Sequence, residues 1–257
     1  MTTSSTMILS SLISNRRSLS EYLTLSYQNQ LRSQPQQSVS AKIWIHEPYP
    51  FLRSIDSSWL QPHQLNLLQL CNSPQKRLAY FAQHALWIAL TECRPNIIPF
   101  QMATQLEFGD LLDLSKEQLS QCFYFLGLFD LALDLRRLVE TKTMQDIQNA
   151  LTKRQTVFIT KLAKAPSSVD FGSMDLKSWN GAIDTLQEML LHRGTNRFAK
   201  AIFGIDDQLI WYLERIQSLN DANTWKSQIK DLNNPSAHAS LCNELKMVCE
   251  YIKGSTV

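Results

Sequence analysis

Apolar side chains recur every three or four residues along most of the chain after residue 62. The pattern is strongest over residues 116–140, at Leu119, Cys122, Phe123, Leu126, Phe129 and Leu133. This period is typical of an α-helix that buries one face. The four residues before the pattern, Ser115-Lys116-Glu117-Gln118, form a capping box, which starts helices. We therefore predict a helix over 116–140.

Residues 122–133 are apolar on nearly every side of this predicted helix, and only Asp130 interrupts them. A helix of that kind is buried all round, so we expect it at the centre of the core. Gly127 either kinks the helix or allows another helix to cross it closely. The run is too short to span a bilayer, and the chain contains no stretch of about 18 uncharged apolar residues, so no transmembrane helix is predicted.

Further helices are predicted wherever the same period is bounded by caps and breakers. The expected N-caps are Ser73, Thr143 and Asp175, and Gly194 is expected to end a helix. The predicted ranges are 74–94, 143–165, 176–193, 195–203, 206–219, 221–232 and 236–253. The fold class that follows is all-α, with a single compact multi-helix globular domain over residues 42–257.

The N-terminal 41 residues differ in composition from the rest of the chain. Eleven serines fall within residues 1–40, and a Gln-rich stretch follows from Gln28 to Gln37. Such composition favours a disordered or loosely helical tail. The capping box Ser18-Leu19-Ser20-Glu21 predicts that one piece of this tail is helical.

Residues 41–62 form the least helical part of the predicted domain, since three prolines interrupt a run of aromatic residues. These aromatics either plug the core or anchor an interface, because Trp, Tyr and Arg dominate binding hot spots. A paired arginine at the end of helix 116–140 is either a solvated helix end or a partner contact. The partner-binding candidates are Trp44, Tyr49, Phe51, Arg53, Arg136 and Arg137.

The charge distribution argues against a nucleic-acid-binding domain. The formal net charge is +2, and residues 1–40 account for all of it with three arginines and one glutamate. The basic and acidic residues of the rest of the chain are equal in number. Nucleic-acid binders normally carry a basic excess. The five cysteines are odd in number and lack C-x-x-C spacing, which favours reduced, buried thiols and a cytoplasmic location. The alternative, an organelle transit peptide in the Ser-rich start, stays open.

The search for catalytic, cofactor or metal sites yields no complete constellation. Ser73-Pro74-Gln75-Lys76 matches S-x-x-K, but the accompanying motifs of penicillin-recognising enzymes are absent. His238, Cys242 and Cys249 share one helix face, yet no fourth zinc ligand is evident, so core packing is favoured. We predict no enzyme activity, cofactor or metal. An enzyme whose site is assembled only in space remains an alternative.

The segment Phe125-Leu-Gly-Leu-Phe-Asp-Leu-Ala-Leu-Asp-Leu-Arg-Arg-Leu-Val139 resembles a region of the SctK (YscK-like) family. There, too, a Leu-Gly-Leu helix leads into paired arginines, and an amphipathic helix follows, as Met144–Leu162 does here. Phe51-Leu52-Arg53 and Ser58-Trp59-Leu60 are similar to an aromatic segment near that family's N-terminus. The resemblance covers roughly residues 50–215.

The family consists of cytoplasmic accessory proteins of the bacterial type III secretion sorting platform. The resemblance implies a non-enzymatic adaptor that links the inner-membrane ring to the pod protein. Its partners would be other secretion-apparatus proteins, with no nucleic acid and no membrane insertion, and it would be peripheral to the inner membrane through those partners. The alternative function is a helical secreted effector or secretion chaperone of an intracellular bacterium, with the Ser-rich N-terminus as export signal.

Overall fold

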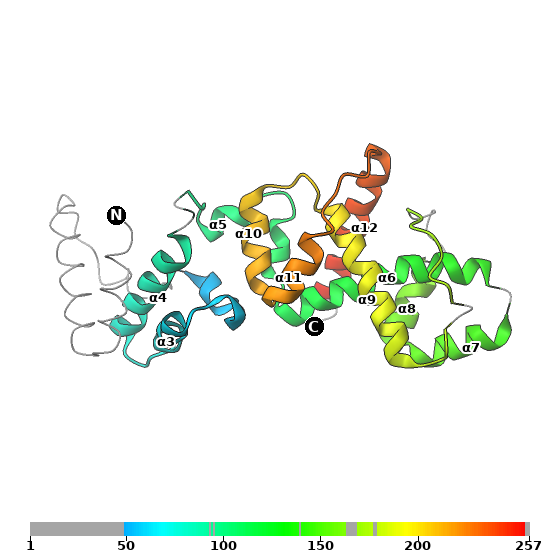
Figure 1. Cartoon of the computed structure of the whole chain (residues 1–257), viewed down its shortest axis with the longest axis horizontal. Coiled ribbons are helices and arrows are strands. Elements are labelled where there is room, and N and C mark those ends of the chain that lie inside the picture. The colour runs from blue at the N-terminus through cyan, green and yellow to red at the C-terminus, as the bar shows by residue number, and fades with distance from the viewer. Residues whose placement is uncertain are drawn as a thin grey trace. The chain divides into compact units, whose positions relative to one another are not determined.

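The computed structural model describes residues 49–92, 94, 96–138, 140–162, 169–176 and 179–254. Every regular element in these ranges is a helix (Figure 1), which confirms the all-α prediction. The predicted tail over residues 1–41 and the candidate Trp44 lie outside the described residues. None of the described helices is both long and apolar enough to cross a membrane.

The chain divides into two compact units, Met1–Phe100 and Gln101–Val257, and the sequence analysis did not include this division. In the first unit, α3 and α4 pack against each other. Its described elements are η2 (Pro50–Arg53), η3 (Ser57–Trp59), α3 (Pro62–Cys71) and α4 (Lys76–Thr91), while α5 (Phe100–Ala103) begins at the division. The stretch predicted to be irregular therefore contains two short 3-10 helices.

The second unit is built around α6 (Figure 1), which packs against α8, α9 and α12. Its elements are η4 (Gly109–Asp113), α6 (Lys116–Arg137), α7 (Thr141–Ala150), α8 (Lys153–Leu162), α9 (Ile183–Ala201), α10 (Asp207–Ile216), α11 (Leu219–Lys226) and α12 (Pro235–Lys253). Helix α6 is thus the element that the other long helices of this unit cover.

Helix α6 begins as the sequence predicts. Ser115 accepts a hydrogen bond from the backbone N–H of Gln118, and the Gln118 side chain accepts one from the Ser115 N–H. Between Cys122 and Leu133 every residue is buried or half-buried, Asp130 included. The prediction that this stretch lies at the centre of the core is confirmed for the second unit.

Two glycines let α6 and α9 approach each other at backbone distance. A Cβ atom at Gly127 would lie 2.1 Å from the carbonyl oxygen of Leu190, and one at Gly194 would lie 1.6 Å from that of Phe123. Real Cβ atoms essentially never come so close, so both positions require glycine. Gly127 therefore serves the close helix crossing. The prediction that Gly194 ends a helix is wrong, because α9 continues through it to Ala201.

The predicted helix start at Asp175 is also wrong. Residues 169–176 are not helical, Asp175 itself has a φ of 53°, and α9 begins only at Ile183. The backbone of this segment is bonded to side chains of α6 and α9, and also to the Asp170 and Ser173 side chains of the segment itself. We call residues 169–176 the strap. The apolar spacing that begins at Leu176 therefore does not start a helix there, and the helix begins only at Ile183.

The single helix predicted over 143–165 is broken into α7 and α8. The break follows from a second capping box, at Thr152 and Gln155. The Thr152 N–H donates to the Gln155 side chain, and the Gln155 N–H donates to the Thr152 hydroxyl. These bonds start α8 at Lys153 and leave Leu151 extended at the end of α7.

Truncating the centre of α6 should be costly. Leu126 is fully buried, and the Phe123 ring meets the Phe198 ring edge-on at a centroid distance of 4.9 Å. We expect Phe123→Ala and Leu126→Ala each to lower the free energy of unfolding by about 2–5 kcal/mol, because each leaves a cavity. Urea denaturation measures the loss. Losses under about 0.5 kcal/mol at both positions would contradict a central role for α6.

Candidate functional site

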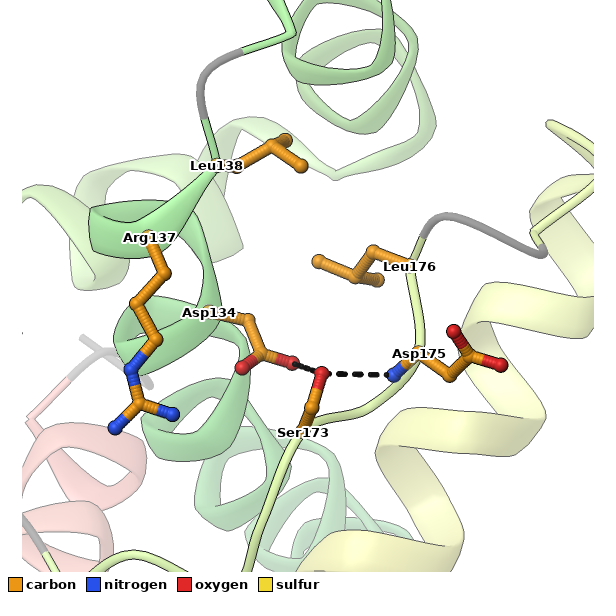
Figure 2. Close-up of a pocket in the computed structure, with 6 residues that line it drawn as sticks. All are labelled: Asp134, Arg137, Leu138, Ser173, Asp175 and Leu176. Carbon is orange, nitrogen blue, oxygen red and sulfur yellow. Dashed lines mark hydrogen bonds between the residues drawn. The ribbon is translucent and has the colours of Figure 1, made fainter.

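A hollow of about 270 Å³ lies between the C-terminal end of α6 and the strap. Figure 2 shows the residues that line it, which come from these two segments: Asp134, Arg137, Leu138, Ser173, Asp175 and Leu176. The hollow adjoins the paired arginines that the sequence analysis selected. One of the predicted partner-binding residues, Arg137, therefore lines a cavity.

The paired arginines hold neighbouring segments to the end of α6. Arg136 donates from Nη2 to the carbonyl oxygen of Leu162, the last residue of α8, at 2.7 Å. Arg137 forms an ion pair of 2.7 Å with Asp170 in the strap. The Arg137 side chain is still 57% exposed. Both arginines are thus bonded to a neighbouring segment and exposed at the surface.

The backbone of the strap is bonded to charged side chains of α6 and α9. Asp134 Oδ2 accepts hydrogen bonds from the Met174 N–H at 2.5 Å and the Ser173 hydroxyl at 3.3 Å. Arg193 donates to the carbonyl oxygens of Phe171 and Ser173, at 3.0 and 2.5 Å. These bonds satisfy backbone groups that a helix or sheet would otherwise pair.

A buried arginine joins the three helices below the strap. Arg197, on α9, is 0% exposed and bonds Glu244 of α12 at 2.6 Å and Asp130 of α6 at 2.5 Å. It also donates to the Val169 carbonyl in the strap. The Phe171 ring lies 5.1 Å from its guanidinium, a cation–π distance. The strap is thus anchored to the charged centre of the unit.

This cluster places two carboxyl groups around one guanidinium. Burial raises the pKa of Asp130, and the hydrogen bond and charge of Arg197 act in the opposite direction. Asp130 Oδ2 is enclosed and has no hydrogen-bond partner. The sequence analysis missed the cluster. The available signal was Asp130 itself, because a charge inside an apolar helix needs a buried partner.

Among the aromatic candidates, Tyr49 is half-buried against α4. Its ring stacks on Trp87 with centroids 5.0 Å apart and planes 9° apart, and its hydroxyl bonds His84 Nδ1 at 2.9 Å. Burial raises the pKa of Tyr49, with a smaller contribution from Tyr80, and burial lowers the pKa of His84. Tyr49 thus fastens the chain to α4 and keeps part of its surface exposed.

The remaining candidates of this segment differ in accessibility. Phe51 is 1% exposed, and its ring stacks on Phe100 at 5.6 Å, so it is a core residue that a partner cannot reach in this conformation. Arg53, at the end of η2, is exposed. Trp44 lies outside the described residues. Tyr49, Phe51 and Arg53 belong to the first unit, and the paired arginines belong to the second.

On α12, His238 lies beside Cys242, whereas Cys249 lies beside Cys122 of α6. Cys242 Sγ is 3.8 Å from His238 Nε2, and burial raises the pKa of that thiol. Cys249 is buried and accompanies Cys122, whose pKa rises through their mutual hydrogen bond and through burial. Over the described part of the chain, no three His, Cys, Asp or Glu side chains are placed to hold a metal ion.

Comparison with known proteins adds no relative. No protein-family model matches the chain, and neither a curated protein nor a solved structure is similar to it. The functional conclusion therefore rests on the residues of this chain.

Proposed function

We propose that this protein is a non-enzymatic adaptor of a bacterial type III secretion sorting platform, joining the inner-membrane ring to the pod protein. The observation that carries the proposal is the resemblance of residues 125–139 to the SctK family. In support, residues 125–137 of this stretch belong to α6, the central helix of its unit. The same helix ends in the paired arginines beside the hollow.

The geometry at this end of α6 suits an adaptor. Arg137 is exposed but held in one orientation by Asp170. An oriented arginine loses less conformational entropy on docking than a free one, and arginines are frequent hot spots. Ion pairs, helix packing and the buried Arg197 cluster keep the supporting segments in place. A partner would thus meet a surface that is already formed.

The role of Arg137 can be tested by an alanine replacement. We expect Arg137→Ala to leave the melting temperature nearly unchanged, because both members of its ion pair are exposed. Recovery of the ring or pod protein should fall at least about thirtyfold if Arg137 is a hot spot. Arg77→Ala, an exposed arginine on α4, is the matched control. Wild-type recovery by both Arg137→Ala and Arg53→Ala would remove these residues from the interface.

Deleting the gene in its native host tests the adaptor proposal at the level of the cell. An adaptor is required for export by the apparatus and stays in the cell, so deletion should abolish secretion of all substrates. Expression of the wild-type protein should restore it. Normal secretion without this protein would contradict the proposal.

The alternative function is a secreted effector or secretion chaperone, and the Ser-rich start of the chain favours it. Residues 1–30 contain only two arginines and one glutamate among many serines. The test fuses residues 1–30 to a reporter enzyme and measures its export by the type III apparatus. Export would favour the effector, whereas the adaptor proposal predicts that the reporter remains in the cell.

A further inference from the structure

Asp134 is a nearly buried carboxylate that lines the hollow. Its side chain is only 7% exposed, and both of its hydrogen bonds with the strap are made by Oδ2. No described residue donates a hydrogen bond to the other oxygen, Oδ1. This oxygen is not fully enclosed by the described residues. One oxygen of a nearly buried carboxylate beside the hollow therefore keeps some access to solvent. Such a group favours a cationic hydrogen-bond donor.

The arginines near the hollow are bonded to other groups, and the Asp134 carboxylate is the polar group on its inner side. Figure 2 shows Asp134 directed toward the strap, with the Arg137 side chain beside it on the side away from Leu176. The Arg137 guanidinium is paired with Asp170 at 2.7 Å, and Arg193 donates to two strap carbonyls. Asp175 adds a further carboxylate at the exposed rim. A negative group thus meets any side chain that enters.

The walls of the hollow are apolar. Leu138, just after α6, and Leu176, at the end of the strap, lie on opposite sides of it (Figure 2). Lysine and arginine side chains bury their methylene stems on apolar surface while their charged heads bond acceptors. The volume of about 270 Å³ exceeds what a single water needs, which is about 30 Å³. A long basic side chain matches both the walls and the inner carboxylate.

We propose that the hollow binds a lysine or arginine side chain presented by a protein partner. The stem lies between Leu138 and Leu176, and the charged head donates to Asp134 Oδ1. This inference rests on the proposed adaptor function and specifies the chemistry of the partner at one contact. It also gives Asp134 two roles, one for each oxygen: Oδ2 fixes the strap, and Oδ1 receives the partner.

The test uses the full chain and small probes, so it requires no knowledge of the partner. N-acetyl-arginine amide and N-acetyl-lysine amide are titrated while the methyl NMR signals of Leu138 and Leu176 are followed. N-acetyl-citrulline amide is the neutral control, since citrulline has the shape of arginine without its charge. We expect saturable shifts of both leucines with at least one basic probe, and affinity at least tenfold lower for citrulline.

Two variants distinguish binding of the probe in the hollow from nonspecific attraction of the probe to surface charge. Asp134→Asn keeps an oxygen that can accept the strap hydrogen bonds but removes the charge, so it should fold and lose at least tenfold in probe affinity. Asp175→Asn, at the rim, should change the affinity less than twofold. Equal binding of citrulline, or unchanged affinity in folded Asp134→Asn, would overturn the inference. So would the absence of saturable shifts at the two leucines.

The two proposals can fail separately. Probe binding with the expected variant profile, combined with failure to recover ring or pod proteins, would keep the basic-side-chain site and reject the secretion adaptor. Recovery of those proteins that is equal for wild type and Asp134→Asn, without probe binding, would keep the adaptor and reject the site.

Discussion

Replacing Arg197 with alanine should lower the free energy of unfolding by about 3–5 kcal/mol, the loss typical of removing one partner from a buried ion pair. The arginine is fully buried and bonds Asp130, Glu244 and the Val169 carbonyl, so its removal takes a bonded cation away from two buried carboxyl groups. Urea denaturation at pH 8 measures the loss. A loss below about 1 kcal/mol would contradict the cluster described for α6, α9 and α12.

The same variant should be less destabilised in acid. Burial already raises the pKa of Asp130, and loss of the hydrogen bond and charge of Arg197, which act to lower that pKa, should raise it further above its unfolded value. The folded state then binds more protons than the unfolded state, so the stability of the variant falls as pH rises between those values. We therefore expect a smaller difference from wild type near pH 5 than at pH 8. An equal difference at both values would show that the two carboxyl groups do not cause the loss.

A compensated variant distinguishes charge from packing. Replacing Arg197, Asp130 and Glu244 together with Met, Leu and Met removes every charge of the cluster while retaining volume. Buried ion clusters in other proteins tolerate such exchange, so the triple variant should recover most of the stability lost by Arg197→Ala. If it is as unstable as Arg197→Ala, the cation acts chiefly through its bond to the strap.

The second large effect is expected from Gly194→Ala. The added Cβ would lie 1.6 Å from the Phe123 carbonyl oxygen, which belongs to the backbone of α6 and cannot rotate away. Helices α6 and α9 would have to separate and loosen the packing between them, including the Phe123–Phe198 contact. We expect a loss of at least about 3 kcal/mol, at the upper end of overpacking effects, or failure to fold.

Gly254→Ala is the matched control for this replacement. Gly254 ends α12 with a φ of −68°, which alanine adopts readily, and its added Cβ would meet only the Glu250 carbonyl at 3.2 Å. Its effect should stay within about 1 kcal/mol. Thermal unfolding of both variants compares them directly. Wild-type stability of Gly194→Ala would mean that α6 and α9 do not cross at this distance.

The helical class and the course of α6 could be predicted because their causes are local. The Ser115 capping box and the all-round apolar run at 122–133 lie within the helix that they specify. The role of Gly194 could not be predicted in the same way. A glycine that ends a helix and a glycine under a crossing helix have the same sequence signature, and the decisive neighbour, Phe123, is distant in the chain.

The candidate site was predictable in part. The paired arginines at the end of α6 stand out in the sequence, and they do adjoin the hollow. The strap opposite them lies almost entirely in the gap between the predicted helices 143–165 and 176–193, and only its last residue, Leu176, was predicted to be helical because it has helical spacing with later apolar residues. Hydrogen bonds with Asp134 and Arg193 hold the strap against α6 and α9. These bonds depend on how the two helices pack, which the sequence does not reveal.

Purifying the tagged protein from its native host at native abundance, with quantification of the co-purifying proteins, is the most direct test of the adaptor account. The account predicts enrichment of the inner-membrane ring protein that carries the cytoplasmic domain and of the pod protein. Arg77→Ala should retain both, and Arg137→Ala should lose at least one of them while remaining folded. If neither protein is enriched above an unrelated tagged control, the adaptor account is contradicted.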